Sequence, residues 1–283
     1  MRTWFITGCS TGFGRLLTLA CLDRGDMVMA TARRQEDLDA LSAEAREKPG
    51  KLHTAAVDVT SEDDARVAVE DLLTYEGRLD VLVNNAGYGY MATQEEGDLA
   101  EIKAMYEVNV FGLIRTTQAV LPHFRTGGGG TIVNLSSVAG RLGLPRGGFY
   151  QSTKWAVECL SQSVFFETSR YGVKVRVIEP GAYDTDFGSR SIRIQESLKD
   201  GTSPYLEQAD AWLKAAQYIF NTPKQDPIEV VAAILGSVDR PEGFLRVPVG
   251  RDTLAFLALR ETKTDEEYLG TMRSFGYGLG PQG

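Results

Sequence analysis

The sequence has few of the residues that form metal sites or disulfide frameworks. Its 283 residues include three cysteines and two histidines. Three thiols are an odd and sparse set, typical of reduced intracellular cysteines and not of a disulfide-stabilised secreted domain. The histidines, His53 and His123, are far apart and no cluster of other ligands accompanies them, which disfavours a metal enzyme.

Long hydrophobic runs and an excess of positive charge are also missing. No segment approaches the roughly 18 consecutive apolar residues of a membrane-spanning helix, and the first residues form no signal-peptide pattern. The formal net charge is -8, which argues against a nucleic-acid partner because phosphate binding needs a basic surface. We therefore expect a cytoplasmic protein that has neither membrane nor nucleic acid as a partner.

What the sequence does contain is an alternation of apolar, β-rich runs with amphipathic helical segments. Strands separated by helices of this length imply βαβ units and a parallel sheet, whose strands are apolar throughout because both faces are covered. We therefore predict an α/β fold with a doubly wound parallel sheet of the Rossmann type, on one domain spanning 1–283. The expected helices are 14–24, 35–47, 62–75 and 99–121. The expected strands are Thr3–Thr7, Met27–Thr31, Leu52–Val57, Val81–Asn84, Gly130–Ser136, Lys174–Glu179 and Phe244–Val249.

Two segments depart from this alternation. Residues 187–225 begin polar and then show apolar residues at helical spacing, before a helix-start pattern at 226–229. An insertion at this point of such a fold is expected to be a helical lid over the substrate. Residues 264–283 are glycine-rich towards their end and are expected to be either a loosely held tail or an interface arm.

A glycine-rich loop, 7–14, follows the first expected strand and opens the first expected helix. Glycines at this turn allow the backbone to approach a pyrophosphate, whose charge is favoured by the free N–H groups of the helix N-terminus. This strand–turn–helix context predicts a dinucleotide site. Its cofactor-binding residues are expected to be Gly8, Ser10, Thr11, Gly12, Phe13 and Gly14.

The same loop also fits the G-x-S-x-G elbow of α/β-hydrolases, with Ser10 as the nucleophile. That family places its histidine late in the chain, whereas His53 and His123 both lie in the first half. An elbow on the very first strand would also lack the preceding strands that build an oxyanion hole. The hydrolase reading is therefore disfavoured.

The end of the second expected strand indicates which cofactor is bound. An NAD site would place Asp or Glu there, bonded to the ribose 2′-hydroxyl. This chain has Arg33 and Arg34 instead, whose guanidinium groups suit a 2′-phosphate. Arginines near a helix N-terminus oppose the macrodipole, which favours a functional role over simple solvation. We expect NADP(H).

Several short motifs occur in one order over nearly the whole core, from the glycine loop to Asp186. They are 7–14, Asp58-Val59, 84–87, Asn109, Ser136-Ser137, Tyr150 with Lys154, Pro180-Gly181 and Thr185. Each motif alone could occur by chance, but their occurrence in this order is specific. Together they resemble the short-chain dehydrogenase/reductase superfamily, and the overall sequence resembles its hydroxysteroid- and retinol-dehydrogenase-like carbonyl reductases.

The resemblance implies a catalytic set of Asn109, Ser137, Tyr150 and Lys154. Tyr150 would be the general acid or base, Ser137 would bond the substrate oxygen, and Asn109 would hold a water in a proton relay. A phenol with a pKa of about 10 is poorly matched to neutral pH. Lys154 lies one helical turn from Tyr150, and its positive charge is expected to lower the phenol pKa by about three units; the resemblance also assigns Lys154 to the nicotinamide ribose.

The resemblance further implies residues that surround the cofactor. Asp58 and Val59 would flank the adenine. Pro180 and Gly181 form a turn before Thr185, which would bond the nicotinamide carboxamide. Beside Tyr150 and Lys154, the remaining cofactor-binding residues are expected to be Asn85, Ala86 and Gly87.

The expected function is the NADP(H)-dependent interconversion of a ketone or aldehyde with an alcohol. Two alternatives stay open: a non-catalytic NADP-sensing regulator on this fold, and a related epimerase or dehydratase. The aromatic content suggests an apolar or bulky substrate. The helix that carries Tyr150 is apolar on several faces, which suggests a homodimer or homotetramer. Candidate pocket residues are Tyr88, Tyr90, Leu142, Gly143, Phe149, Tyr183 and Phe187.

Overall fold

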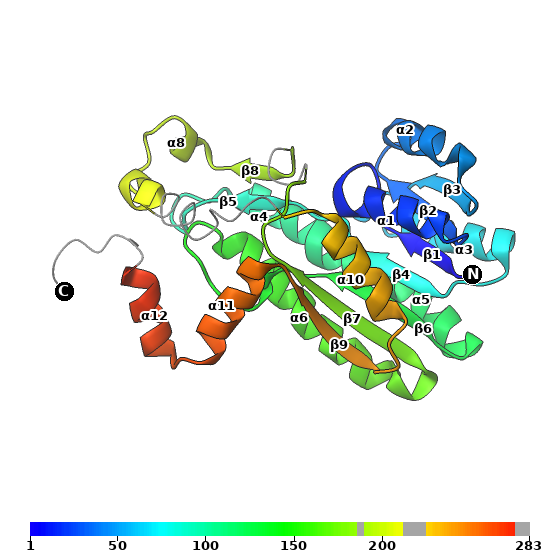
Figure 1. Ribbon diagram of the computed structural model, residues 1–283. Helices are drawn as coiled ribbons and strands as arrows, with labels where there is room; N and C mark the ends of the chain where they lie inside the picture. Colours follow the sequence, from blue (N-terminus) through cyan, green and yellow to red (C-terminus); the bar gives the residue numbers. More distant parts are fainter. Residues whose placement is uncertain (186–189, 212–224, 275–283) are drawn as a thin grey trace.

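A computed structural model describes residues 1–185, 190–211 and 225–274. Its centre is a seven-stranded sheet with all neighbouring strands parallel, in the order β3-β2-β1-β4-β6-β7-β9 (Figure 1). The predicted Rossmann-type sheet is therefore confirmed. The strands are β1 (Thr3–Ile6), β2 (Met27–Ala32), β3 (Lys51–Ala56), β4 (Val81–Asn84), β6 (Gly130–Leu135), β7 (Val173–Pro180) and β9 (Phe244–Val249).

Helices cover both faces of this sheet, as the apolar strands require. Within β1, Trp4 and Ile6 are buried in one core while Phe5 is buried in the other. The first core lies under α1 (Gly12–Asp23), α2 (Glu36–Glu44) and α10 (Ile228–Val238). The second lies under α3 (Asp64–Glu76) and α5 (Leu113–Gly127), with part of α6 (Gly148–Thr168) against it.

The chain reverses its direction of progress across the sheet between β1 and β4. Strands β1 to β3 are laid down towards one edge, and β4, β6, β7 and β9 towards the other. In open parallel sheets a ligand binds beyond the carboxyl ends of the strands at this reversal. The loops that follow β1, β4, β6 and β7 therefore meet at one place.

The single helix expected over 99–121 is divided into three parts. It begins as α4 (Leu99–Tyr106), widens into a π-helical segment, η2 (Glu107–Gly112), and continues as α5. A short helical turn, η3 (Val138–Gly140), follows β6. Single π-helical turns are frequent at functional sites, and this one contains Asn109.

Sequence patterns missed several smaller elements. Strands β5 (Gly89–Met91) and β8 (Ile192–Ile194) form a separate two-stranded parallel sheet, and α8 (Glu196–Lys199) follows. These elements lie at the opposite end of the molecule from α2 and β3 (Figure 1). The described part of the expected lid, 190–211 and Gln225, thus contains a strand; residues 187–189 and 212–224 lie outside the described residues.

The chain beyond 264 is not loosely held where the structure describes it. After α11 (Arg251–Glu261), residues Asp265–Ser274 form α12. Tyr268 and Met272 of α12 are buried against Val138 and Leu142, and this contact explains why the segment is ordered. Residues 275–283 of the expected tail lie outside the described residues. Within the described part of the chain, no helix is both long and apolar enough to cross a membrane.

Candidate active site

The glycine loop forms a close-packed turn between β1 and α1. Gly8 and Gly12 have φ of 71° and 59°, the left-handed region that glycine adopts without strain. A Cβ on Gly14 would lie less than 3.0 Å from the carbonyl oxygen of Gly8. Helix α1 begins at Gly12 with no acidic residue in its first turn, and Thr11 precedes it without a side-chain cap. The free N–H groups at this end suit an anionic group.

Hydrogen bonds tie this loop to the one after β4. The Oγ1 of Thr7 accepts from the backbone N–H groups of Asn85 and Ala86, both at 3.0 Å. The Nδ2 of Asn85 donates to the carbonyl oxygens of Thr7 (2.8 Å) and Gly8 (2.9 Å). Asn85 and Ala86 thus lie against the glycine loop, and Thr7 holds the two loops together.

The two arginines after β2 have different surroundings. Arg34 donates to Asp37 from Nη2 at 2.6 Å and from Nε at 3.0 Å. Arg33 is exposed, and its guanidinium makes no ion pair with any residue that the structure describes. From the sequence, both arginines were expected to bind the 2′-phosphate in the same way. Of the two guanidinium groups, that of Arg33 is the one without an ion pair to a described residue.

Asp58 and Val59, which were expected beside the adenine, are each held by their own contacts. Asp58 Oδ1 accepts from the backbone N–H of Thr60 at 2.9 Å and from its hydroxyl at 2.8 Å. Val59 is buried, and a Cβ on Gly112 would come within 2.8 Å of its Cγ2. The π-helical segment therefore packs directly on the loop after β3.

Tyr150 and Ser137 are brought together at the carboxyl ends of β6 and β7. Burial raises the pKa of Tyr150 to about 12, and the hydrogen bond between its hydroxyl and that of Ser137 opposes this rise. The expectation that Lys154 lowers this pKa below 10 is wrong for this structure. The physical reason is that desolvation dominates, while Lys154 Nζ is 5.7 Å from the ring centroid and is bonded elsewhere.

Lys154 is 8% exposed, and its Nζ donates to the backbone oxygen of Leu135 at 2.8 Å. Burial lowers its pKa to about 8, and the negative charge of Glu158 opposes this. A lysine with this pKa is still mainly an ammonium at neutral pH and can also release a proton there. It is thus suited to proton transfer.

The two adjacent serines have separate environments. Ser137 Oγ donates to the carbonyl oxygen of Pro180 at 3.2 Å and accepts from the N–H of Ala139 at 3.2 Å, at the start of η3. Ser136 is buried and faces Gly140. A Cβ added at Gly140 would lie 2.6 Å from Ser136 Oγ. Ser137 is the serine that faces Tyr150.

Asn109 is buried in the π-helical segment and reaches the loop after β4. Its Nδ2 donates to the carbonyl oxygen of Tyr88 (2.8 Å) and to Thr153 Oγ1 (3.1 Å), and its Oδ1 accepts from the N–H of Tyr88 (3.0 Å). Thr153, on the helix of Tyr150, was not identified from the sequence. Its only signal was its position between Tyr150 and Lys154.

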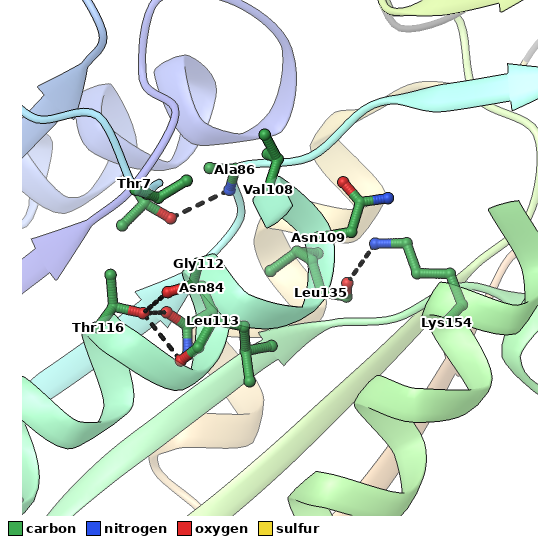
Figure 2. Close-up of a pocket in the computed structure, with 11 residues that line it drawn as sticks. Thr7, Asn84, Ala86, Val108, Asn109, Gly112, Leu113, Thr116, Leu135 and Lys154 are labelled. Atoms are coloured by element: carbon green, nitrogen blue, oxygen red, sulfur yellow. Dashed lines mark hydrogen bonds between the residues drawn. The ribbon is translucent and has the colours of Figure 1, made fainter. Parts of the chain in front are cut away.

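Asn109 and Lys154 approach the same small cavity from the π-helical segment and from α6 (Figure 2). Its volume is about 10 Å³, close to the minimum for a single water molecule. Gly87 lies at its rim, because a Cβ there would be 3.1 Å from Asn109 Oδ1 and 3.9 Å from Lys154 Nζ. Thr7 and Ala86 also line it, so it adjoins the glycine loop.

The turn after β7 is held by residues far along the chain. A Cβ on Gly181 would come within 3.0 Å of the Asp252 carboxylate, which accepts from the N–H of Ala182 at 2.7 Å. Gln225 Nε2 donates to Asp252 Oδ1 (2.8 Å) and to the carbonyl oxygen of Ala182 (3.0 Å). This turn places Pro180 against Ser137 and leads to Thr185. Asp252 and Gln225 had no local signal in the sequence.

The candidate pocket residues divide into three groups. Tyr88 and Phe149 pack around buried Tyr90 together with Tyr150, and the rings of Tyr90 and Phe149 stack at 6.5 Å. Leu142 belongs to the core under α12, while Gly143 is exposed. Tyr183 meets Phe13 of the glycine loop edge to face at 5.8 Å. Phe187 lies outside the described residues.

Comparison with known proteins gives consistent matches. The model of the family described as "short chain dehydrogenase" matches residues 2–195. The chain is 34% identical to the oxidoreductase BOA17 of Botryotinia fuckeliana, covering 90% of this chain and 91% of that protein. It is 35% identical to 17-beta-hydroxysteroid dehydrogenase type 1 of Mus musculus, over 92% of this chain and 76% of that protein.

Solved structures also match the fold of this chain. A short-chain dehydrogenase from Streptomyces avermitilis has a TM-score of 0.79 at 34% identity, covering 97% of this chain and 95% of that one. An alcohol dehydrogenase from Thermococcus sibiricus, in complex with 5-hydroxy-NADP, has a TM-score of 0.72 at 26% identity, over 88% and 96%. A family member from Burkholderia phymatum, in complex with NAD, shares the fold with a TM-score of 0.78 at 22% identity, over 92% and 93%.

Proposed function

The chain belongs to the short-chain dehydrogenase/reductase family and is an oxidoreductase, and we propose that it reduces a ketone or aldehyde with NADPH, or oxidises the matching alcohol. The observation that carries this proposal is the convergence of Ser137, Tyr150, Lys154 and Asn109 beside the glycine loop. Both known nicotinamide cofactors occur in structures of this fold.

The residues present fit a nicotinamide dinucleotide. The loop at 7–14 has no side chain at Gly8 or Gly14 where backbone is packed closely, so a pyrophosphate can approach the N-terminus of α1. The nicotinamide end would then lie near Gly87 and the Gly181 turn, beside Tyr150, Lys154 and Thr185. When bound, the cofactor would supply or accept the hydride.

Tyr150 and Ser137 would act on the substrate oxygen. Because the pKa of Tyr150 is about 12, its phenol is protonated at neutral pH and can donate a proton to the oxygen as a carbonyl is reduced. Ser137 would donate a second hydrogen bond to the same oxygen, exchanging its present bond to Pro180. The raised pKa therefore supports reduction as the direction to test first.

Lys154 and Asn109 would return the proton to Tyr150. The cavity between them is the size of one water molecule, and Lys154 has a pKa of about 8. A water there could pass a proton from the solvent side towards Lys154. The buried amide of Asn109, fixed by three hydrogen bonds, would keep the π-helical segment open at this point.

NADP(H) is the proposed cofactor, with Arg33 as the principal partner of the 2′-phosphate. Arg33 is exposed at the end of β2 with its guanidinium uncommitted among the described residues, and no acid follows β2 directly to bond a 2′-hydroxyl. Arg34 would contribute only by giving up its bonds to Asp37. An anion at Arg33 gains charge-assisted bonds without that exchange.

We propose an apolar or bulky substrate and a homo-oligomer. Tyr88, Tyr90 and Phe149 pack around Tyr150, and the curated relatives include a hydroxysteroid dehydrogenase and a protein named retinol dehydrogenase 8. On α6, Trp155 is 52% exposed and Phe166 is 75% exposed. Large apolar side chains left in solvent on one helix support pairing of two copies through α6.

The test is consumption of NADPH and NADH with a panel of aromatic, aliphatic and steroidal ketones, in the wild-type protein and in Tyr150→Phe. We expect NADPH-dependent reduction that falls about 100-fold or more in Y150F, because the proton donor is lost while the ring stays. NADPH binding without turnover on any carbonyl would instead favour a cofactor-sensing role. A preference for NADH would overturn the assignment of Arg33.

A further inference from the structure

Behind Lys154 lies a group of charged side chains that the proposed reaction does not use. Glu158 of α6 is 5% exposed and Glu179 of β7 is fully buried. Arg246 of β9 and Arg141, which follows η3, reach the same place with their guanidinium groups. Four charges on four elements thus meet directly under the turn of α6 that carries Lys154.

The two carboxylates share one cation, which donates a hydrogen bond to Glu158 and forms an ion pair with Glu179. Arg246 Nε lies 2.9 Å from Glu158 Oε2 and 3.4 Å from Glu179 Oε1. Arg141 Nη1 also bonds Glu179 Oε1, at 3.1 Å, while its Nη2 is bonded to Glu261 of α11 at 3.0 Å. The charge of Glu158 is therefore balanced by Arg246, whereas Glu179 is near both Arg246 and Arg141.

Each carboxylate also has one oxygen without a donor. Glu158 Oε1 and Glu179 Oε2 are buried and have no hydrogen-bond partner among the described residues, and the same is true of Ser136 Oγ beside them. A buried, ionised oxygen with no donor is costly. Two such oxygens in one cluster favour uptake of a proton by the pair, and burial together with the charge of Glu158 raises the pKa of Glu179 to about 7.

Gly140 allows this cluster to contact the active site. A Cβ at Gly140 would lie 2.6 Å from Ser136 Oγ and 3.1 Å from both Glu158 Cγ and the Lys154 carbonyl oxygen. The turn η3, which begins after Ser137, is therefore pressed onto α6 at the turn that joins Lys154 to Glu158. The charged cluster and the proposed catalytic residues form one packed unit.

We propose that Glu158 is a positioning residue whose carboxylate, held by Arg246, favours the charged form of Lys154. Glu158 lies one helical turn after Lys154, on the same face. Its charge opposes the loss of the lysine proton that burial promotes. Without it, Lys154 would be a buried cation held by the backbone oxygen of Leu135.

This inference deepens the proposed function and rests on it only for its kinetic consequence. The direct test is the pKa of Lys154 itself, measured by pH-dependent acetylation of the cofactor-free protein and mass spectrometry of the peptide containing Lys154. Glu158→Gln should label at a pH lower by about one unit or more than the wild type, as expected when an opposite charge is removed nearby. Glu158→Asp, which keeps the charge, should restore most of the difference.

Two further variants separate this role from a structural one. Glu179→Gln leaves Arg246 to Glu158 alone, so the pKa of Lys154 should stay at the wild-type value or rise. Arg246→Gln should move it in the direction of Glu158→Gln by a smaller amount. Arg240→Gln is the matched control, because it removes an exposed arginine–glutamate pair, with Glu242, before the same strand; it should leave Lys154 unchanged.

Equal pKa values of Lys154 in the wild type and in Glu158→Gln would overturn the proposal, as would equal shifts in Glu158→Gln and Glu179→Gln. If Glu158→Gln does not fold by circular dichroism, the comparison of Arg246→Gln with Arg240→Gln decides the matter in the same way. Because labelling needs no turnover, these outcomes stand even if no carbonyl substrate is found. If one is found, the activity of Glu158→Gln in alcohol oxidation should rise with pH about one unit earlier than that of the wild type, because Lys154 can then accept the relayed proton at a lower pH.

Discussion

The cofactor side and the catalytic side of the active site use different kinds of chemical group. Around the glycine loop, the cofactor side uses uncharged groups: glycines without side chains, the Thr7 hydroxyl and the Asn85 amide. Its proposed charged contact, Arg33, lies apart from this loop, after β2. The catalytic side rests on buried charge, with Lys154 above Glu158, Glu179 and two arginines. The affinity for the cofactor should therefore change when the shape of the loop is altered and should not depend on pH. Catalysis should instead depend on the protonation of the buried side chains.

The largest effect is expected from shape on the cofactor side. In Gly14→Ala the new Cβ would overlap the Gly8 carbonyl oxygen, so the loop must open where a pyrophosphate would lie. We expect the Kd for NADPH to rise about 100-fold, equivalent to about 2.7 kcal/mol, at every pH from 6 to 9. Titration of NADPH fluorescence measures this.

Gly270→Ala is the control for that change, because a Cβ at Gly270 in α12 meets nothing within 4 Å. It should leave the Kd unchanged and stabilise the helix by up to about 1 kcal/mol. A rise in Kd that depends on pH in Gly14→Ala would show that charge also acts on the cofactor side.

The second effect concerns the turn at Gly181, where the catalytic side reaches the nicotinamide end. In Asp252→Ala the N–H groups of Ala182 and Thr253 and the amide of Gln225 lose their acceptor. We expect the free energy of unfolding to fall by about 2 kcal/mol and KM for NADPH to rise. Urea unfolding and initial rates measure the two; a rise in KM with unchanged stability would mean that Asp252 contacts the cofactor directly.

A smaller effect should separate the two arginines after β2. Arg33→Ala should raise KM for NADPH about 10-fold, the loss of roughly one charge-assisted bond, and leave KM for NADH unchanged. Arg34→Ala should change KM for NADPH by less than about twofold, because Asp37 already binds that guanidinium. Equal effects of the two substitutions would contradict the distinction that the structure draws between them.

The smallest effect is a dependence of stability on pH that only the catalytic side should show. The pKa of Glu179 in the folded protein is about 7, above its ordinary value of 4.5. The folded state therefore keeps a proton that the unfolded chain has lost, so stability falls as pH rises from 4.5 to 7. In Glu179→Gln this fall should be shallower by about 1 kcal/mol, measured by urea unfolding at several pH values. Parallel curves for the two proteins would show that Glu179 is ionised throughout this range.

The same contrast explains what could be predicted from the sequence. All seven strands of the main sheet were predicted. The central strands β1, β4 and β6 are buried on both faces and therefore form apolar runs. The glycine loop, Tyr150 and Lys154 each lie in short motifs with fixed spacing. Such features depend on residues that are close together in the chain, so they can be predicted from the local sequence.

Other features depend on contacts between distant residues. Strands β5 and β8 are three residues each and pair across about a hundred positions. The raised pKa of Tyr150 depends on its burial by several elements. Asp252 acts on a turn 70 positions earlier, and the Glu158–Glu179 pair exists only because β7 packs beneath α6. None of these leaves a periodic or spaced pattern.

Helix α12 has a consequence for how the protein is made. Its Tyr268 and Met272 cover Val138 and Leu142, next to the turn that begins at Ser137. The glycine loop and strands β1 to β4 come from the first hundred residues, but the core beneath them is closed only by α10, and the surroundings of Ser137 only by α12. Both halves of the site therefore need the last third of the chain. A chain released early from the ribosome would carry most of the site residues without the helices that enclose them.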